Sequence, residues 1–190
     1  MSYRSDRAWS DRFIPAIRRI VGPHLLEPSS LKVDTQQAAD LVVLTGRDLT
    51  IAARVRRPGY VDRHPYEFTL RAHRASGART ELQKIVDRWG DWLLYGHAIN
   101  DTDPEIGRWM IVDLHSFRSS YARRIITDGM SGMKKNTDGA TAFAWFDVRG
   151  FAQCRDPILI ASSFTLDEPA EPAGPQMPPP PGKQQLDLFT

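Results

Sequence analysis

Arginines and aromatic residues recur together between residues 54 and 95, a combination suited to binding nucleic acid. Guanidinium groups bind phosphate through paired hydrogen bonds, and aromatic rings stack on unpaired bases. The candidate phosphate-binding residues are Arg54, Arg56, Arg57, Arg71, Arg74, Lys134 and Lys135, and the candidate stacking residues are Tyr60, Trp92 and Tyr95. The alternative is that the arginines form a solvated sheet face and the aromatic residues a core, which is what we expect of Trp89 and Trp92.

The charge of the chain is distributed unevenly. Four carboxylates against one lysine give residues 166–190 a net charge of −3, which leaves +5 on the remainder of a chain whose total is +2. All but five of the 25 basic residues are arginine. We therefore expect the first 165 residues to favour a polyanionic partner such as DNA.

A proline-rich segment precedes a short apolar peptide. Seven of the 14 prolines lie in residues 166–183, which predicts an extended linker that adds nothing to a core. Residues 185–189 then read Gln-Leu-Asp-Leu-Phe. Such a peptide after a flexible spacer is typical of a segment that docks into a partner's pocket. The alternative is that Leu186, Leu188 and Phe189 fold back as a strand on the body.

The pentapeptide resembles the consensus Gln-Leu-(Ser/Asp)-Leu-Phe by which bacterial replication and repair proteins bind the DNA polymerase sliding clamp. The resemblance covers these five residues alone, and it implies a partner rather than an activity. It implies that Leu186, Leu188 and Phe189 enter a hydrophobic pocket of the clamp. It also implies that Gln185 occupies a small polar subsite and that Asp187 faces solvent or a basic rim.

The apolar patterns predict an α+β (or α/β) fold, in which a mixed central sheet is flanked by helices. The expected order is helix, three strands, helix, two strands, helix and two strands. We expect residues 1–165 to form a single globular domain, residues 166–184 a flexible linker, and residues 185–190 the clamp-binding peptide.

Local signals place several of these elements. Thr80 and Gln83 form a capping-box pattern at the start of a helix with an apolar stripe, and Gly90 fits its end. Ser10 or Asp11 is the expected cap of an N-terminal helix. Residues 39–45 and 49–56 are expected to be a strand and its returning partner, and residues 128–139 a mobile loop. Residues 92–97 and 109–114 are expected to pair as strands.

The predicted order of a helix, three strands and a helix resembles the core of the PD-(D/E)xK nuclease superfamily. In that family an Asp on the first strand and a Glu-x-Lys on the next hold Mg²⁺, which activates water for phosphodiester cleavage. Asp40 precedes an apolar run as the family's first Asp does. The family pattern would put Glu at Arg54 and Lys at Arg56, so the chain departs from it, and arginine cannot ligate Mg²⁺.

The resemblance then implies a site assembled from other residues. Asp40 and Glu67 would hold Mg²⁺, Asp34 would add a third oxygen ligand, and Lys84 would approach from the side. Strand alternation predicts that Glu67, Thr69 and Arg71 share one face. The alternative is that Asp34 and Asp40 are ordinary loop and strand-edge charges, that Glu67 pairs with an arginine, and that Lys84 is solvated.

Other chemistry has little support in the sequence. The single cysteine, Cys154, excludes an intrachain disulfide, and the five histidines lack metalloprotease spacing. No phosphate-binding glycine loop and no run of 18 apolar residues occur. With a polar N-terminal stretch, these features predict a cytoplasmic, nucleoid-associated protein without a membrane partner.

Three hypotheses follow. The first is a protein of DNA replication, repair or recombination that binds the sliding clamp through residues 185–189 and DNA through its basic body. The second is an enzyme, a Mg²⁺-dependent DNA nuclease, which is the sole case in which a cofactor is expected. The third is a non-enzymatic phage or plasmid modulator that competes for the clamp pocket. Catalytic activity and oligomeric state are left open.

Overall fold

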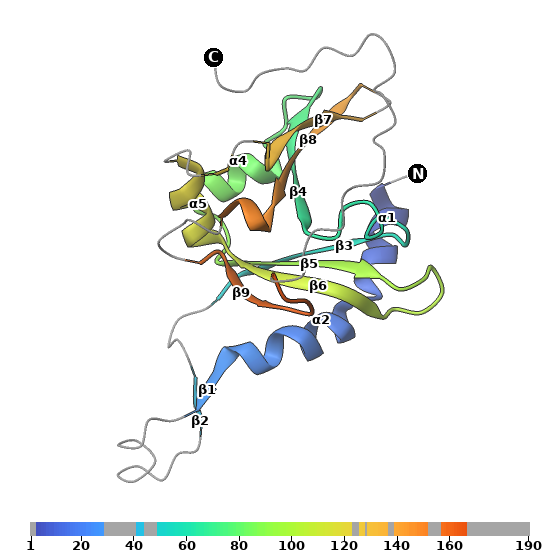
Figure 1. Ribbon diagram of the computed structural model, residues 1–190. Helices are drawn as coiled ribbons and strands as arrows, with labels where there is room; N and C mark the ends of the chain where they lie inside the picture. Colours follow the sequence, from blue (N-terminus) through green and yellow to red (C-terminus); the bar gives the residue numbers. More distant parts are fainter. Residues whose placement is uncertain are drawn as a thin grey trace. The chain divides into compact units, whose positions relative to one another are not determined.

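The computed structural model (Figure 1) describes residues 3–28, 41–43, 49–122, 126–127, 129–136, 139–151 and 157–166. The described residues fall into two compact units. The first unit takes its residues from the ranges Met1–Pro58, Gly90–Leu114 and Leu159–Ser163, and the second from Gly59–Trp89, His115–Ile158 and Phe164–Thr190. In the described residues, no helix is both long enough and apolar enough to span a membrane.

The first unit is built on a four-stranded mixed sheet with the order β3-β5-β6-β9. Its strands are β3 (Ile51–Arg56), β5 (Trp92–Ala98), β6 (Ile106–Asp113) and β9 (Leu159–Ser162). β3 runs parallel to β5, and the other neighbours are antiparallel. The unit also contains α1 (Tyr3–Asp11), α2 (Ile14–Val21), the 3-10 turn η1 (Gly22–Leu25) and the antiparallel pair β1 (Leu26–Pro28) and β2 (Leu41–Val43).

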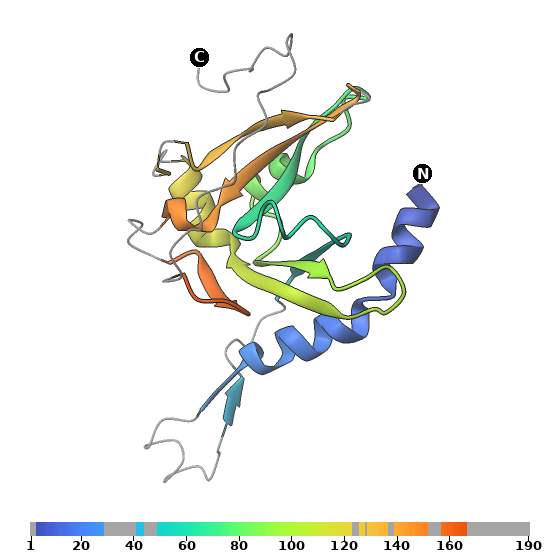
Figure 2. The ribbon, with the colours of Figure 1, turned by 45° about the vertical axis from the view of Figure 1, so that its right-hand side comes forward.

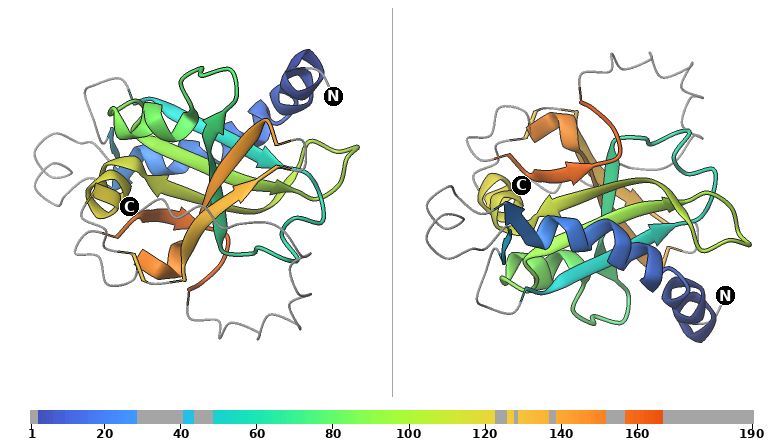
Figure 3. Two further views of the ribbon diagram at one scale, coloured as in Figure 1. Left: turned by 90° about the horizontal axis from the view of Figure 1, so that it is seen from above. Right: turned by 90° about the horizontal axis from the view of Figure 1, so that it is seen from below.

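One face of this sheet packs against α2, which lies across the strands in the right-hand view of Figure 3. Val21 of α2, Leu94 of β5 and Ile111 of β6 are buried together. Partly buried apolar residues surround them: Ile17, Ile20, Leu25, Ile51, Trp92, Ile106, Trp109 and Ala161. Burial of such side chains contributes about 1.5–3 kcal/mol each, so this layer orders the sheet.

The second unit is built on a three-stranded antiparallel sheet with the order β4-β8-β7, seen in Figure 2 as two orange strands beside a green one. Its elements are β4 (Glu67–Arg74), α4 (Glu81–Val86), α5 (Leu114–Ala122), β7 (Ser131–Lys135), β8 (Thr141–Asp147) and the 3-10 turn η2 (Val148–Phe151). The core is aromatic: Phe68, Phe117, Phe146 and Phe151 are buried, and their rings contact one another or Tyr121.

The structure confirms the predicted α+β class, since helices accompany one mixed and one antiparallel sheet. It confirms the pairing of β5 with β6. It also confirms the start of α4, because Thr80 accepts a hydrogen bond from the Gln83 backbone while the Gln83 side chain accepts one from the Thr80 backbone. The register places Glu67, Thr69 and Arg71 on one face of β4, as their alternation predicted, and the buried Phe68 and Leu70 on the other.

Three local predictions were wrong. β2 pairs with β1, and β3 pairs in parallel with β5, so the predicted hairpin of residues 39–56 does not form in the described residues. The predicted loop of residues 128–139 contains a strand, β7, which is held by antiparallel pairing with β8. The N-terminal helix is two helices, and α2 begins after Phe13, which makes no side-chain cap.

Candidate functional site

One face of the three-stranded sheet collects cations and aromatic rings. Across β4, β8 and β7 the register joins Thr69, Trp145 and Gly132 in one rung and Arg71, Phe143 and Lys134 in the next. Paired residues of neighbouring strands point to the same side of a sheet. These residues therefore lie opposite the aromatic core face that carries Phe68 and Phe146. We define the outer face as Arg71, Arg74, Phe143, Trp145 and Lys134.

A β-bulge adds the second arginine to the outer face. The register shifts between Arg71 and His73, so that Arg71 pairs with Phe143, His73 with Ala142 and Arg74 with Thr141. The extra residue in β4 changes the alternation of the strand, as bulges do. Arg74 therefore lies on the same side as Arg71 although it is three residues away, and both face the β8 row of Thr141, Phe143 and Trp145.

The two aromatic rings of the outer face are held in different ways. The Arg71 guanidinium carbon lies 5.5 Å from the centre of the Phe143 ring, in cation–π contact. The Trp145 indole lies across Gly132 of β7, where a Cβ atom would come within 2.8 Å of the indole nitrogen. The absence of a Cβ at position 132 thus leaves the room that the Nε1, Cε2 and Cζ2 atoms of the indole occupy.

The cations of the outer face are not used in internal ion pairs. Among the described residues, neither Arg71, Arg74 nor Lys134 forms a salt bridge, whereas Arg57 pairs with Asp101 and Arg79 with Asp87. Lys134 is exposed, and Arg71 and Arg74 are half-buried. Three unpaired positive charges beside two half-exposed rings suit an anion that carries flat groups.

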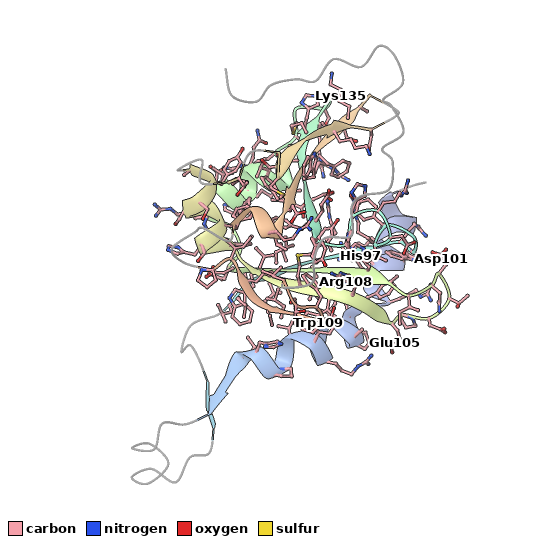
Figure 4. All side chains as sticks on the ribbon, viewed as in Figure 1. His97, Asp101, Glu105, Arg108, Trp109 and Lys135 are labelled. Atoms are coloured by element: carbon pink, nitrogen blue, oxygen red, sulfur yellow. The ribbon has the colours of Figure 1, made fainter. Side chains whose placement is uncertain are left out.

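Lys135 differs from its neighbour Lys134 in the face that it occupies. Lys135 pairs with Ala142 in the rung beside Lys134, so it points to the opposite side of the strand. It is exposed near the far end of the β7–β8 pair (Figure 4). The sequence prediction had grouped both lysines as one DNA-binding pair in a loop, but the structure separates their directions.

Carboxylates lie at the other end of the outer face. Glu67 pairs across the strands with Asp147, and its carboxylate lies 2.9 Å from the His64 Nδ1. Asp147 is buried and accepts hydrogen bonds from the backbone N–H, Nε and Nη2 of Arg149. That hydrogen bonding raises the pKa of Arg149. Both carboxylates are therefore already engaged by basic partners.

This engagement bears on the predicted metal site. Among the described residues, no group of three or more His, Cys, Asp or Glu side chains is arranged to hold a metal ion. Glu67 is bound by His64 rather than by the predicted arginines, and Asp34 and Asp40 lie outside the described residues. The Mg²⁺ site predicted from Asp34, Asp40 and Glu67 therefore stays a prediction.

Lys84 is exposed on α4, and its Nζ lies 5.8 Å from the centre of the Trp89 ring. Arg79 lies 5.5 Å from the same ring. The prediction that Trp89 is core was wrong, since its side chain is 56% exposed. The reason is that α4 ends at Val86, so Trp89 is no longer on the helical stripe of Leu82 and Ile85.

The arginines of β3 belong to the four-stranded sheet. The Arg56 Nε donates a hydrogen bond of 2.7 Å to the hydroxyl of Tyr95, and register places Arg54 opposite Tyr95. Tyr95 has no exposed surface, so the prediction that it stacks on bases was wrong. The Tyr95 hydroxyl instead accepts a hydrogen bond inside the protein from the half-buried guanidinium of Arg56.

Arg57 lies beyond β3 and serves the first unit. It pairs with Asp101 in the turn between β5 and β6, and its guanidinium lies 4.7 Å from the centre of the Trp9 ring. Figure 4 shows Asp101 and Glu105 in this turn, which Arg12 also contacts through backbone carbonyls. The candidate arginines therefore come from two different sheets, since β3 and β4 are not in the same one.

Sequence reasoning missed Phe143, Trp145 and Asp147. The signal was present, because in residues 141–147 aromatic residues occupy both alternating faces, which leaves Phe143 and Trp145 opposite the buried Ala144 and Phe146.

The predicted clamp peptide, residues 185–189, lies outside the described residues, as does Cys154. Comparison of the chain with protein-family models, curated proteins and solved structures finds no match.

Proposed function

We propose that this protein acts in DNA metabolism, is recruited to the bacterial DNA polymerase sliding clamp by residues 185–189, and contacts DNA through the outer face. The observation that carries the DNA-binding part is the set of three cations without ion pairs on the outer face. A protein that neutralises phosphates with such residues gains affinity by releasing counterions.

The clamp-binding part is supported by the sequence of the peptide. Residues 185–189 match the clamp-binding consensus at every position, and a proline-rich stretch of net negative charge precedes them. We expect such an extended stretch to keep a short peptide accessible to a partner. Tethering raises the local concentration of a weak DNA binder by effective molarity.

Capture on an immobilised bacterial sliding clamp tests the recruitment. The variant Leu188→Ala with Phe189→Ala removes two predicted anchors, and Gln184→Ala with Thr190→Ala is the matched control outside the pentapeptide. We expect the control to be captured like the wild type and the anchor variant to be lost. Equal capture of the anchor variant would contradict recruitment by this peptide.

Metal-dependent cleavage by Asp40 and Glu67 stays a prediction of the sequence. Incubation with branched, nicked and single-stranded DNA plus Mg²⁺ or Mn²⁺ tests it, with Asp40→Ala and Glu67→Ala as variants. Cleavage that both variants retain would exclude this site. The modulator hypothesis instead predicts that the peptide alone inhibits clamp-dependent synthesis even when the outer-face cations are neutralised.

A further inference from the structure

We propose that the outer face binds single-stranded rather than duplex DNA, with bases stacked on Trp145 and Phe143 and phosphates bound by Arg71, Arg74 and Lys134. This inference rests on the proposed function, since it specifies the form of DNA that the protein contacts. It also assigns roles to Phe143 and Trp145, which the basic residues alone do not explain.

The aromatic residues form the central row of the outer face. Phe143 and Trp145 lie on β8, the middle strand, while the arginines lie on β4 and Lys134 on β7. Neighbouring strands are about 4.8 Å apart, so cations flank the aromatic row on both sides. A nucleic acid strand that follows β8 would meet rings beneath its bases and positive charge along its backbone.

The spacing of the rings favours an unpaired strand. Phe143 and Trp145 are two residues apart on one strand, so their Cα atoms are about 7 Å apart. Bases in a duplex follow each other at about 3.4 Å per strand and cover one another's faces. Two bases that stack on these two rings must therefore be separated from each other, which a flexible single strand permits.

The environment of each ring fits this role. The Trp145 indole packs against Gly132 of β7, where the absence of a Cβ makes room for it. Arg71 lies in cation–π contact with Phe143 and forms no salt bridge among the described residues. The guanidinium lies over the Phe143 ring, and its plane can itself stack on a base while its N–H groups donate to a phosphate, so a base would lie above Phe143 with Arg71 between them.

Fluorescence anisotropy with a labelled oligothymidine and a duplex of equal length tests the proposal at two or more salt concentrations. The wild type should bind the single strand more tightly than the duplex. Trp145→Leu, which keeps an apolar side chain over Gly132, should weaken single-strand binding by about 5- to 150-fold. Circular dichroism melts of each variant establish that it is folded, and Phe143→Leu provides a second stacking variant.

Adjacent lysines provide the matched charge control. Lys134→Gln should weaken binding and reduce the slope of log K against log salt by about 0.7, the value for one contact to a single strand. Lys135→Gln, on the opposite side of β7, should leave both unchanged. Equal effects of the two substitutions, or tighter binding of duplex, would overturn the proposal while leaving DNA binding intact. If the wild type bound neither form, the DNA part of the proposed function would itself fail.

Discussion

Arg88, two residues after the end of α4, has a backbone φ of 67°, in the left-handed region that favours glycine. The helix ends in a Schellman motif around it. The Arg88 N–H donates to the Ile85 carbonyl, and the Trp89 N–H donates to the Lys84 carbonyl. Glycine usually occupies the position of Arg88 in this motif, so Arg88→Gly should relieve strain without removing these backbone hydrogen bonds.

The size of the effect follows from two opposing terms. A residue with a Cβ in the left-handed region costs about 1–2 kcal/mol. Glycine itself destabilises the folded state by about 0.5–1 kcal/mol relative to alanine, because it loses more conformational freedom on folding. Arg88→Ala keeps the strain and removes the exposed charge, so the comparison of the two variants isolates the backbone. We expect Arg88→Gly to be about 1 kcal/mol more stable than Arg88→Ala.

Urea unfolding followed by far-ultraviolet circular dichroism measures this difference, and a thermal melt should show about 2–4 °C for a chain of this size. Arg88→Asn should fall between the two variants, since asparagine tolerates the left-handed region better than alanine. The reasoning would be refuted if Arg88→Gly were equal to Arg88→Ala or less stable. Such a result would mean that the conformational entropy of glycine outweighs the backbone strain.

Three further substitutions test the account of the fold in the same unfolding assay. Thr80→Ala should destabilise the protein by about 1 kcal/mol through loss of the α4 capping box, and Thr80→Ser should restore most of it. Asp147→Ala should cost about 2–3 kcal/mol, because it leaves the Arg149 donors without their buried acceptor. Because Asp147 raises the pKa of Arg149, the stabilisation from this pair is fully present below the ordinary arginine pKa and is lost only in strongly alkaline solution. A destabilisation by Asp147→Ala that changed between pH 6 and 9 would contradict this reasoning. Tyr95→Phe should cost about 1.5–3 kcal/mol, since the charged Arg56 loses its acceptor, and an unchanged midpoint would contradict that role.

Local signals explain which parts of the fold could be predicted. The capping box of Thr80 and Gln83 lies within four residues, and the pairing of β5 with β6 needs a single turn. The end of α4 could not be predicted in the same way, because Gly90 looked like the terminator. Gly90 does have a φ of 80°, but the helix already ends around Arg88, two residues earlier, which has a φ of 67°. That difference moved Trp89 from an expected core position to the surface.

Nonlocal pairing explains what the sequence could not show. β3 joins β5 in parallel across β4 and α4, and no turn signal marks such a crossover. β7 is a strand of Ser, Gly, Met and Lys, residues with weak strand preference, and its pairing with β8 supplies the stabilisation. The division of the candidate arginines between two sheets could not be foreseen for the first reason. The outer face was missed for the second reason, since Gly132 and Lys134 come from β7.

The central claim is that one molecule binds the clamp and DNA together. The most direct measurement is the affinity of the protein for a sliding clamp loaded on DNA with a single-stranded segment, compared with its affinity for each component alone. The account predicts that the loaded clamp is bound at least about tenfold more tightly than either component, as expected for a tethered second contact. Leu188→Ala with Phe189→Ala should reduce this affinity to that for the DNA alone. The same affinity for the loaded clamp and for the DNA alone in the wild type would contradict the claim.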